Sequence, residues 1–196
     1  MSDATATLTR TVDGEVLPAP GIFALDPVHS HVGFSVRHMM ISNVRGEFRT
    51  VRGDLKLNEG DITQSQIDIE IDTSSIHTRD EQRDAHLRSP DFLDMERHPL
   101  LTFRSTKVEK AGVDALRVQG DLTIHGVTRN VELDIDSISP ATKDPWGNVR
   151  MAASASTFIS RKDFGLTWNA ALETGGVLVG DEVTIDLDVQ FVKSQA

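Results

Sequence analysis

The strongest constraint on this chain is a repeated alternation of apolar and polar residues, which is typical of β-strands with one buried and one solvated face. The clearest run is Ile67–Asp72, which reads Ile-Asp-Ile-Glu-Ile-Asp. The same period, in places less regular, recurs at residues 32–37, 46–57, 101–108, 116–124, 131–136, 150–159 and 183–191. The pattern predicts about eight strands, nearly all with a single apolar face.

Strands of this kind favour an antiparallel sheet, because parallel strands buried on both faces read as continuous apolar runs. Turn-forming residues between the strand candidates predict short hairpin connections at residues 58–61, 110–112, 125–126 and 144–148. Such strands build either a β-sandwich or a closed up-and-down barrel, and the apolar residues would fill the core of the first or line a cavity in the second. The alternation does not decide between the two.

One segment departs from the strand pattern. Thr78-Arg79-Asp80-Glu81 resembles a capping box, so we expect a helix with Thr78 as its N-cap. Ser89-Pro90 predicts a second short helix, with Ser89 as N-cap and Pro90 at the first helical position. We therefore predict a helical insert between two strands, whose apolar contacts are Leu87, Phe92 and Leu93.

Length, charge and cysteine content restrict the class of protein. The 196 residues suffice for one domain with a real core, and we divide them into a polar lead, residues 1–20, expected to be mobile, and a β domain, residues 21–193. A net charge of -10 disfavours a nucleic acid partner, because phosphate backbones bind basic surfaces. The absence of cysteine excludes disulfides, thiol catalysis and cysteine-ligated metal sites.

Membrane and export signals are also missing from the sequence. No stretch approaches the roughly 18 consecutive apolar residues of a membrane-spanning helix. The lead, residues 1–20, lacks the basic start and the continuous apolar run of a secretory signal peptide. We therefore expect a cytoplasmic protein.

The histidines suggest two hypotheses that we rank low. His29 and His31 are two residues apart, so on a strand they would share a face and could bind a metal ion, although ordinary hydrogen-bonded histidines explain the spacing better. His86 could form an acid–base dyad with Asp84 or Asp91, but nothing in the spacing favours one. We assign no catalytic residue, no metal ligand and no cofactor.

Basic residues gather locally despite the acidic total. They lie near the first hairpin, around the helical insert and after the seventh strand: Arg37, Arg45, Arg49, Arg52, Lys56, Arg79, Arg83, Arg88, Arg97, Arg161 and Lys162. Salt bridges on the outer face explain most of them, because Asp and Glu dominate the outward strand positions. The alternative is that a few converge at one end of the fold to hold an anionic head group.

Several motifs in fixed order resemble one known family. Leu25–His38, which reads LDPVHSHVGFSVRH, resembles the opening motif of the YceI-like, polyisoprenoid-binding family. The resemblance continues in the family's order through residues 44–48, 73–78, 86–93, 99, 103–106, 120–128 and 160–165, and it spans about residues 22–193.

This resemblance implies an extended lipocalin-like fold: an all-β, eight-stranded antiparallel up-and-down barrel with a short helical insert. Members bind long isoprenoid lipids, such as isoprenoid quinones or polyprenyl phosphates, inside the barrel. Many members are periplasmic, and the lead of this chain departs from them. We expect a non-catalytic carrier that sequesters such a lipid. The alternative is an enzyme that acts on a small apolar substrate in the barrel with a histidine as general base.

On this interpretation the strands supply the wall of the lipid site and its ends supply the polar contacts. We predict that the lining is formed by Phe34, Val36, Phe48, Ile69, Phe92, Phe103, Ile124, Phe158 and Phe164, with His38 and Arg161 as candidates for binding the head group. Closure of a barrel removes strand edges, but its faces and loops leave a homodimer open.

Overall fold

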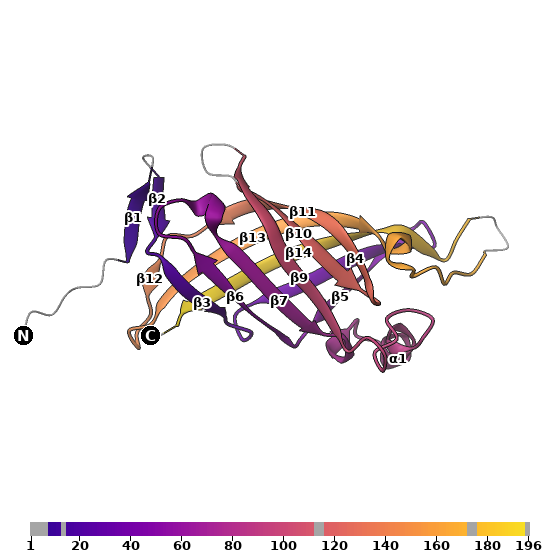
Figure 1. Ribbon diagram of the computed structural model, residues 1–196. Coiled ribbons are helices and arrows are strands. Elements are labelled where there is room, and N and C mark those ends of the chain that lie inside the picture. Colours follow the sequence, from indigo (N-terminus) through magenta and orange to yellow (C-terminus); the bar gives the residue numbers. More distant parts are fainter. Residues whose placement is uncertain (1–7, 13–14, 112–115, 172–175, 195–196) are drawn as a thin grey trace, which may run out of the picture.

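The computed structural model describes residues 8–12, 15–111, 116–171 and 176–194, and it consists mainly of long antiparallel strands (Figure 1). The strands are β1 (Thr9–Val12), β2 (Glu15–Pro18), β3 (Gly21–Leu25), β4 (His31–His38), β5 (Ser42–Phe48), β6 (Val51–Leu57), β7 (Gln66–Asp72), β8 (Ile76–His77), β9 (Leu100–Lys110), β10 (Leu116–Ile124), β11 (Val127–Ile138), β12 (Thr142–Lys143), β13 (Val149–Ser160) and β14 (Val179–Lys193). In the described part of the chain there is one α-helix, α1 (Glu81–Arg88), besides the short 3-10 helices η1 (Ile62–Gln64), η2 (Thr73–Ser75) and η3 (Arg161–Phe164).

The main sheet closes on itself. Within the described ranges, eight strands form a ring in the order β13-β11-β10-β9-β7-β6-β3-β14, and β13 pairs again with β14. At the closure, Phe191 of β14 lies opposite Met151 of β13 on one side and Leu25 of β3 on the other. The structure is therefore the eight-stranded antiparallel barrel that the resemblance predicted, and the β-sandwich alternative is wrong.

Three N-terminal strands are bent rather than straight. β3 and β4 are separated by residues 26–30, β5 and β6 by residues 49–50, and β7 and β8 by η2. The two segments of each bent strand pair with the same neighbouring strand. β3 and β4 both pair with β14, β6 and β5 pair with β3 and β4, and β7 and β8 pair with β6 and β5. Local side chains hold two of the bends: Asp26 Oδ1 accepts the Val28 N–H at 3.0 Å, and Asp72 Oδ1 accepts the Ser74 N–H at 2.8 Å.

The helical insert forms, but its ends differ from the prediction. The N-cap of α1 is Asp80, whose Oδ1 accepts the Arg83 N–H at 2.9 Å, and not Thr78. The Thr78 hydroxyl oxygen accepts instead from Arg83 Nε at 2.7 Å, while its hydroxyl and N–H donate to Asp84 Oδ1 at 2.5 and 2.8 Å. The predicted second helix is a turn: the Ser89 hydroxyl donates to the His86 carbonyl at 2.7 Å and so ends α1.

The N-terminal lead contains a hairpin that the sequence analysis did not predict. β1 and β2 pair in a separate two-stranded sheet, and the Ala19 N–H donates to the Leu8 carbonyl at 2.8 Å. Residues 1–7, for which we expect mobility, lie outside the described residues. The hairpin lies at one end of the barrel and α1 at the other (Figure 1). Over the described ranges, no helix has the length and apolarity needed to cross a membrane.

Candidate functional site

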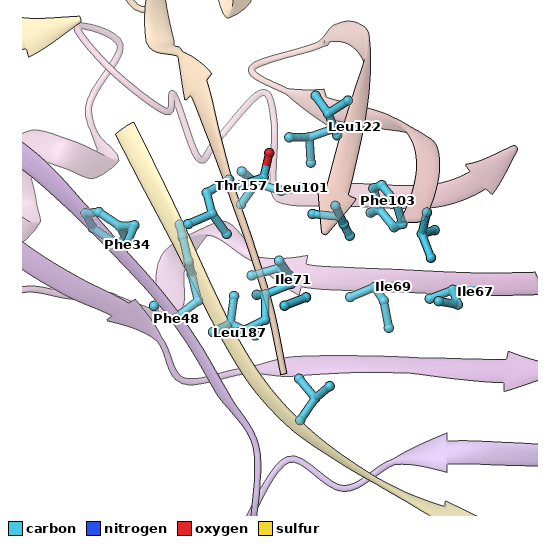
Figure 2. A pocket seen from close by; sticks show the side chains of 18 of the residues that line it. Phe34, Phe48, Ile67, Ile69, Ile71, Leu101, Phe103, Leu122, Thr157 and Leu187 are labelled. Atoms are coloured by element: carbon cyan, nitrogen blue, oxygen red, sulfur yellow. The ribbon is translucent and has the colours of Figure 1, made fainter. Parts of the chain in front are cut away.

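The barrel encloses a cavity of about 310 Å³ whose lining is almost entirely apolar. The alternation of the strands creates it, because inward positions carry large aliphatic and aromatic side chains on every strand of the ring. Figure 2 shows Phe34 of β4, Phe103 of β9 and Leu187 of β14 around this space. In the described chain, the polar side chains that reach the lining are those of Ser65, Thr157 and Arg161.

Most of the predicted lining residues lie on this cavity. They come from five strands and from the segment after α1, and they are Phe34, Val36, Phe48, Ile69, Phe92, Phe103 and Ile124. Their contact with a ligand stays a prediction. The cavity also has a wall that the sequence analysis did not single out, formed by Val183, Ile185, Leu187, Val189 and Phe191 of β14. Their alternation with polar residues along β14 is the sequence signal that indicates an inward position for all five.

Two predicted lining residues lie elsewhere. Phe158 is 71% exposed on the outside of the barrel, because its neighbours Thr157 and Ile159 occupy the inward positions of β13. Phe164 is 1% exposed and packs in the hydrophobic core, but it does not line the cavity. It belongs to η3, beyond the end of β13, where the alternation of the strand no longer applies. The prediction that these two rings line the barrel is therefore wrong.

Arg161 is buried at one end of the cavity and is fully engaged by the protein. The residue is 3% exposed, and burial lowers the pKa of its guanidinium while the charge of Asp181 raises it. Nε donates to the Gly180 carbonyl at 2.8 Å. Nη1 donates to the carbonyls of Leu166 and Trp168 at 2.5 and 2.9 Å, and Nη2 to the Val179 carbonyl and Asp181 Oδ1 at 3.4 and 3.3 Å. All five N–H donors of the guanidinium therefore have protein acceptors.

His38, the other head-group candidate, lies near Arg161. It ends β4 and pairs with Val179, the residue whose carbonyl accepts from Arg161. The His38 side chain is half-buried and shares the parity of the inward residues Phe34 and Val36, but it is outside the cavity lining. The fold thus brings the two candidates to the same end of β14, and head-group binding by either stays a prediction.

His29 and His31, the pair considered for metal binding, contact two different carboxylates. His29 Nδ1 lies 2.9 Å from Asp26 Oδ2, and His31 Nδ1 lies 3.5 Å from Glu47 Oε2. Each histidine therefore has an acidic partner of its own. These pairs lie on the outer surface, since both imidazoles are more than half exposed.

The dyad considered for the catalytic alternative exists with one of its two candidate acids. His86 Nε2 lies 3.0 Å from Asp91 Oδ2, and the His86 ring packs edge-on against Phe92 and Trp168, with centroids 5.0 and 4.7 Å away. Asp84 is engaged elsewhere, with Thr78 and His77. Asp91 is exposed, and neither His86 nor Asp91 lines the cavity. The dyad is therefore not placed to transfer a proton to or from a substrate inside the barrel.

The geometry defines a class of protein, namely a closed antiparallel β-barrel with an apolar internal cavity. The YceI-like domain matches residues 23–191 of this chain, which therefore belongs to the YceI-like family. A UPF0312 protein of Vibrio cholerae is 35% identical over 138 residues, which are 70% of this chain and 72% of the relative. A UPF0312 protein of Staphylococcus epidermidis is 34% identical over 170 residues, which are 86% of this chain and 96% of the relative.

Solved structures share the fold. BcnA of Burkholderia cenocepacia superposes with a TM-score of 0.74 at 22% identity, covering 85% of this chain and 98% of that chain. The YceI protein of Campylobacter jejuni gives a TM-score of 0.67 at 26% identity, covering 81% and 90%. A domain from Saccharophagus degradans, described as polyisoprenoid-binding and implicated in plant cell wall breakdown, gives 0.64 at 16% identity, covering 88% and 98%.

Proposed function

We propose that this protein is a carrier that binds an isoprenoid lipid inside the barrel without altering it chemically. The observation that supports this function best is the cavity of about 310 Å³, whose wall is apolar apart from the side chains of Ser65, Thr157 and Arg161. A polar ligand would lose its hydrogen bonds to water there without replacement, whereas a hydrocarbon chain gains from the transfer. Family membership and the polyisoprenoid-binding domain of Saccharophagus degradans support the same class of ligand.

The size of the cavity favours a slender chain. Its volume, about 310 Å³, lies at the lower end of the range of about 300–1,000 Å³ typical of small-molecule sites. A single linear row of isoprene units suits such a space better than a fused polycyclic lipid. Chains too long for the cavity would have to displace side chains such as Phe34 and Phe103 or leave one end outside.

The electrostatics of the cavity favour an uncharged head group inside it. Arg161 is the charged residue among the described lining residues, and its five donors are already engaged. An isoprenoid quinone meets this electrostatic requirement, because its head group carries no charge. A polyprenyl phosphate would keep its phosphate in water at the end of the barrel, because a buried phosphate without donors is strongly disfavoured.

Two neighbouring residues of β13 provide the test. Thr157 faces the cavity and Phe158 faces outward, so Thr157→Phe adds a ring to the cavity, while Phe158→Ala removes one from the outer surface. We expect the first variant to weaken binding of a quinone by at least about tenfold, since an occupied volume cannot hold the chain. The second variant should bind like the wild type.

Fluorescence or calorimetric titration of both variants, with circular dichroism to confirm that they fold, distinguishes the outcomes. Equal affinity in folded Thr157→Phe and in the wild type would place the ligand outside the cavity. A loss of affinity in Phe158→Ala comparable to that in Thr157→Phe would indicate an outer binding surface instead.

A further inference from the structure

Three potential metal ligands lie close together at the open end of the β9–β10 hairpin, opposite its turn. Asp94 and His98 lie between α1 and β9, and His125 lies in the turn between β10 and β11. Their carboxylate and imidazole ligand atoms all lie within 4.8 Å of one another. The pairing of Thr102 with Thr123 explains this, because it brings the segment before β9 beside the segment after β10.

Asp94 is a buried carboxylate that receives no hydrogen bond from the described residues. The residue is 6% exposed, and its backbone groups, unlike its side chain, are hydrogen-bonded within the turn. The nearest cation is Arg97, whose Nη1 lies 3.8 Å from Asp94 Oδ2, which is beyond hydrogen-bond distance. Because the Arg97 side chain is 80% exposed, solvent weakens this ion pair. The Asp94 side chain keeps only 8% of its surface in solvent, so a cation held against its oxygens would stabilise the charge.

The two imidazoles are held beside each other with their ring nitrogens unused by other described residues. The rings of His98 and His125 are 4.8 Å apart between centroids and tilted by 68°. Gly126 makes room for this arrangement, since a β-carbon there would lie 2.7 Å from Cε1 of His98. A side chain at position 126 would therefore push His98 away from His125.

We propose that Asp94, His98 and His125 form a binding site for a divalent transition-metal ion, with Zn²⁺ as the best-suited ion. Two imidazole nitrogens and one carboxylate oxygen are a ligand set that Zn²⁺ accepts, with a fourth position left for water or an exogenous ligand. Bond lengths of about 2.0–2.2 Å place tetrahedral ligand atoms about 3.3–3.6 Å apart. Binding would therefore draw the three ligand atoms, now within 4.8 Å of one another, closer together by up to about 1.5 Å.

The site would lie at the edge of the lipid cavity without depending on it. Leu93 and Ile124, the residues just before Asp94 and His125, both line the cavity. The open metal position would thus be near one end of the barrel interior. The proposal concerns the metal alone, so it stands or fails separately from lipid binding.

Calorimetric titration of metal-free, tag-free protein with Zn²⁺ tests the site. We expect one ion per chain with a Kd below about 100 µM, and a loss of affinity of at least about 100-fold in the double variant His98→Gln, His125→Gln. The matched control is His29→Gln, His31→Gln, which removes two histidines from the outer surface and should bind like the wild type. Zn²⁺ should also raise the melting temperature of the wild type and of this control, and not that of the site variant.

The wild type alone can overturn the proposal. Absence of one-to-one Zn²⁺ binding below about 100 µM contradicts the site whatever the variants do. Equal affinity in the folded site variant contradicts it as well, because the ion would then be held elsewhere. Should the variant fail to fold, anomalous scattering at the zinc edge from crystals of the wild type decides: a peak between Asp94, His98 and His125 supports the site, and no peak there overturns it.

Discussion

The ring of Phe103 lies against Gly120 on the neighbouring strand, so closely that a β-carbon at Gly120 would collide with it. Phe34 and Gly46, directly paired between β4 and β5, repeat the arrangement. Both phenylalanines line the cavity. Glycine at an inward strand position thus lets a large ring lie along the barrel wall instead of projecting into the space that a ligand would use.

Replacement of Gly120 by alanine should destabilise the barrel. The added methyl group forces the Phe103 ring out of its position, and we expect the free energy of unfolding to fall by about 1–3 kcal/mol. Urea unfolding measures this change. Gly60→Ala is the matched control, because a β-carbon there has no neighbour within 4 Å, and its effect should stay within about 0.5 kcal/mol. Equal effects of the two substitutions would contradict the packing role of Gly120.

Arg161 should be essential for stability, whatever its part in ligand binding. Arg161→Met leaves buried carbonyls without donors, and we expect the free energy of unfolding to fall by about 3–5 kcal/mol. The adjacent Lys162 is half exposed, and its Nζ forms a salt bridge with Asp181 Oδ2 at 2.8 Å. Lys162→Met should therefore cost less than about 1 kcal/mol. Thermal melts of the two variants test this contrast, and a stable Arg161→Met protein would refute the structural role.

An ion-pair network between the β3–β4 bend and the turn before β13 should make the protein sensitive to acid. Arg150 Nε donates to Asp144 Oδ2 at 2.8 Å, and Nη1 donates to Asp26 Oδ2. The hydrogen bond from Arg150, assisted by His29, lowers the pKa of Asp26 to about 2. Because this pKa is lower in the folded than in the unfolded chain, the stabilisation is complete above about pH 4 and is lost as the pH falls towards 2.

Arg150→Gln should remove this part of the pH dependence. Melting temperatures of the wild type and the variant should differ most near neutral pH and converge between about pH 4 and 2. Arg52→Gln serves as the control, since its pair with Glu70 is exposed and screened by solvent. A constant difference between Arg150→Gln and the wild type down to pH 2 would show that the network does not titrate with Asp26.

The alternation of residues predicted much of the cavity wall but not all of it. Where one face of a strand is clearly apolar, as around Phe34 or Phe103, the inward residues follow from parity. In β13, residues 152–157 read Ala-Ala-Ser-Ala-Ser-Thr, so neither face of the strand is clearly apolar. The next residue, Phe158, is large and apolar, which favours an inward position on sequence grounds alone. The pairing with β14, in which Phe158 lies opposite Thr184, places it outside.

Contacts that depend on backbone groups or on distant segments were beyond sequence reasoning. Four of the five acceptors of Arg161 are main-chain carbonyls, which have no signature in a sequence. The closeness of His98 and His125 depends on the register of β9 with β10, which alternation alone does not fix. The sequence suggests a metal site at His29 and His31 instead, because these two histidines are only two residues apart. Closure of the barrel, in contrast, followed from the ordered family motifs.

Native mass spectrometry of the purified protein, followed by organic extraction of whatever it carries, tests the central claim most directly. The account predicts a one-to-one complex with a lipid of isoprenoid mass, or, for protein purified without ligand, saturable binding of an isoprenoid quinone that Thr157→Phe weakens by at least about tenfold. A bound molecule of another class that isoprenoid quinones and polyprenyl phosphates fail to displace would contradict it. The account would also be contradicted if neither metal-free nor metal-loaded protein binds these lipids in a titration.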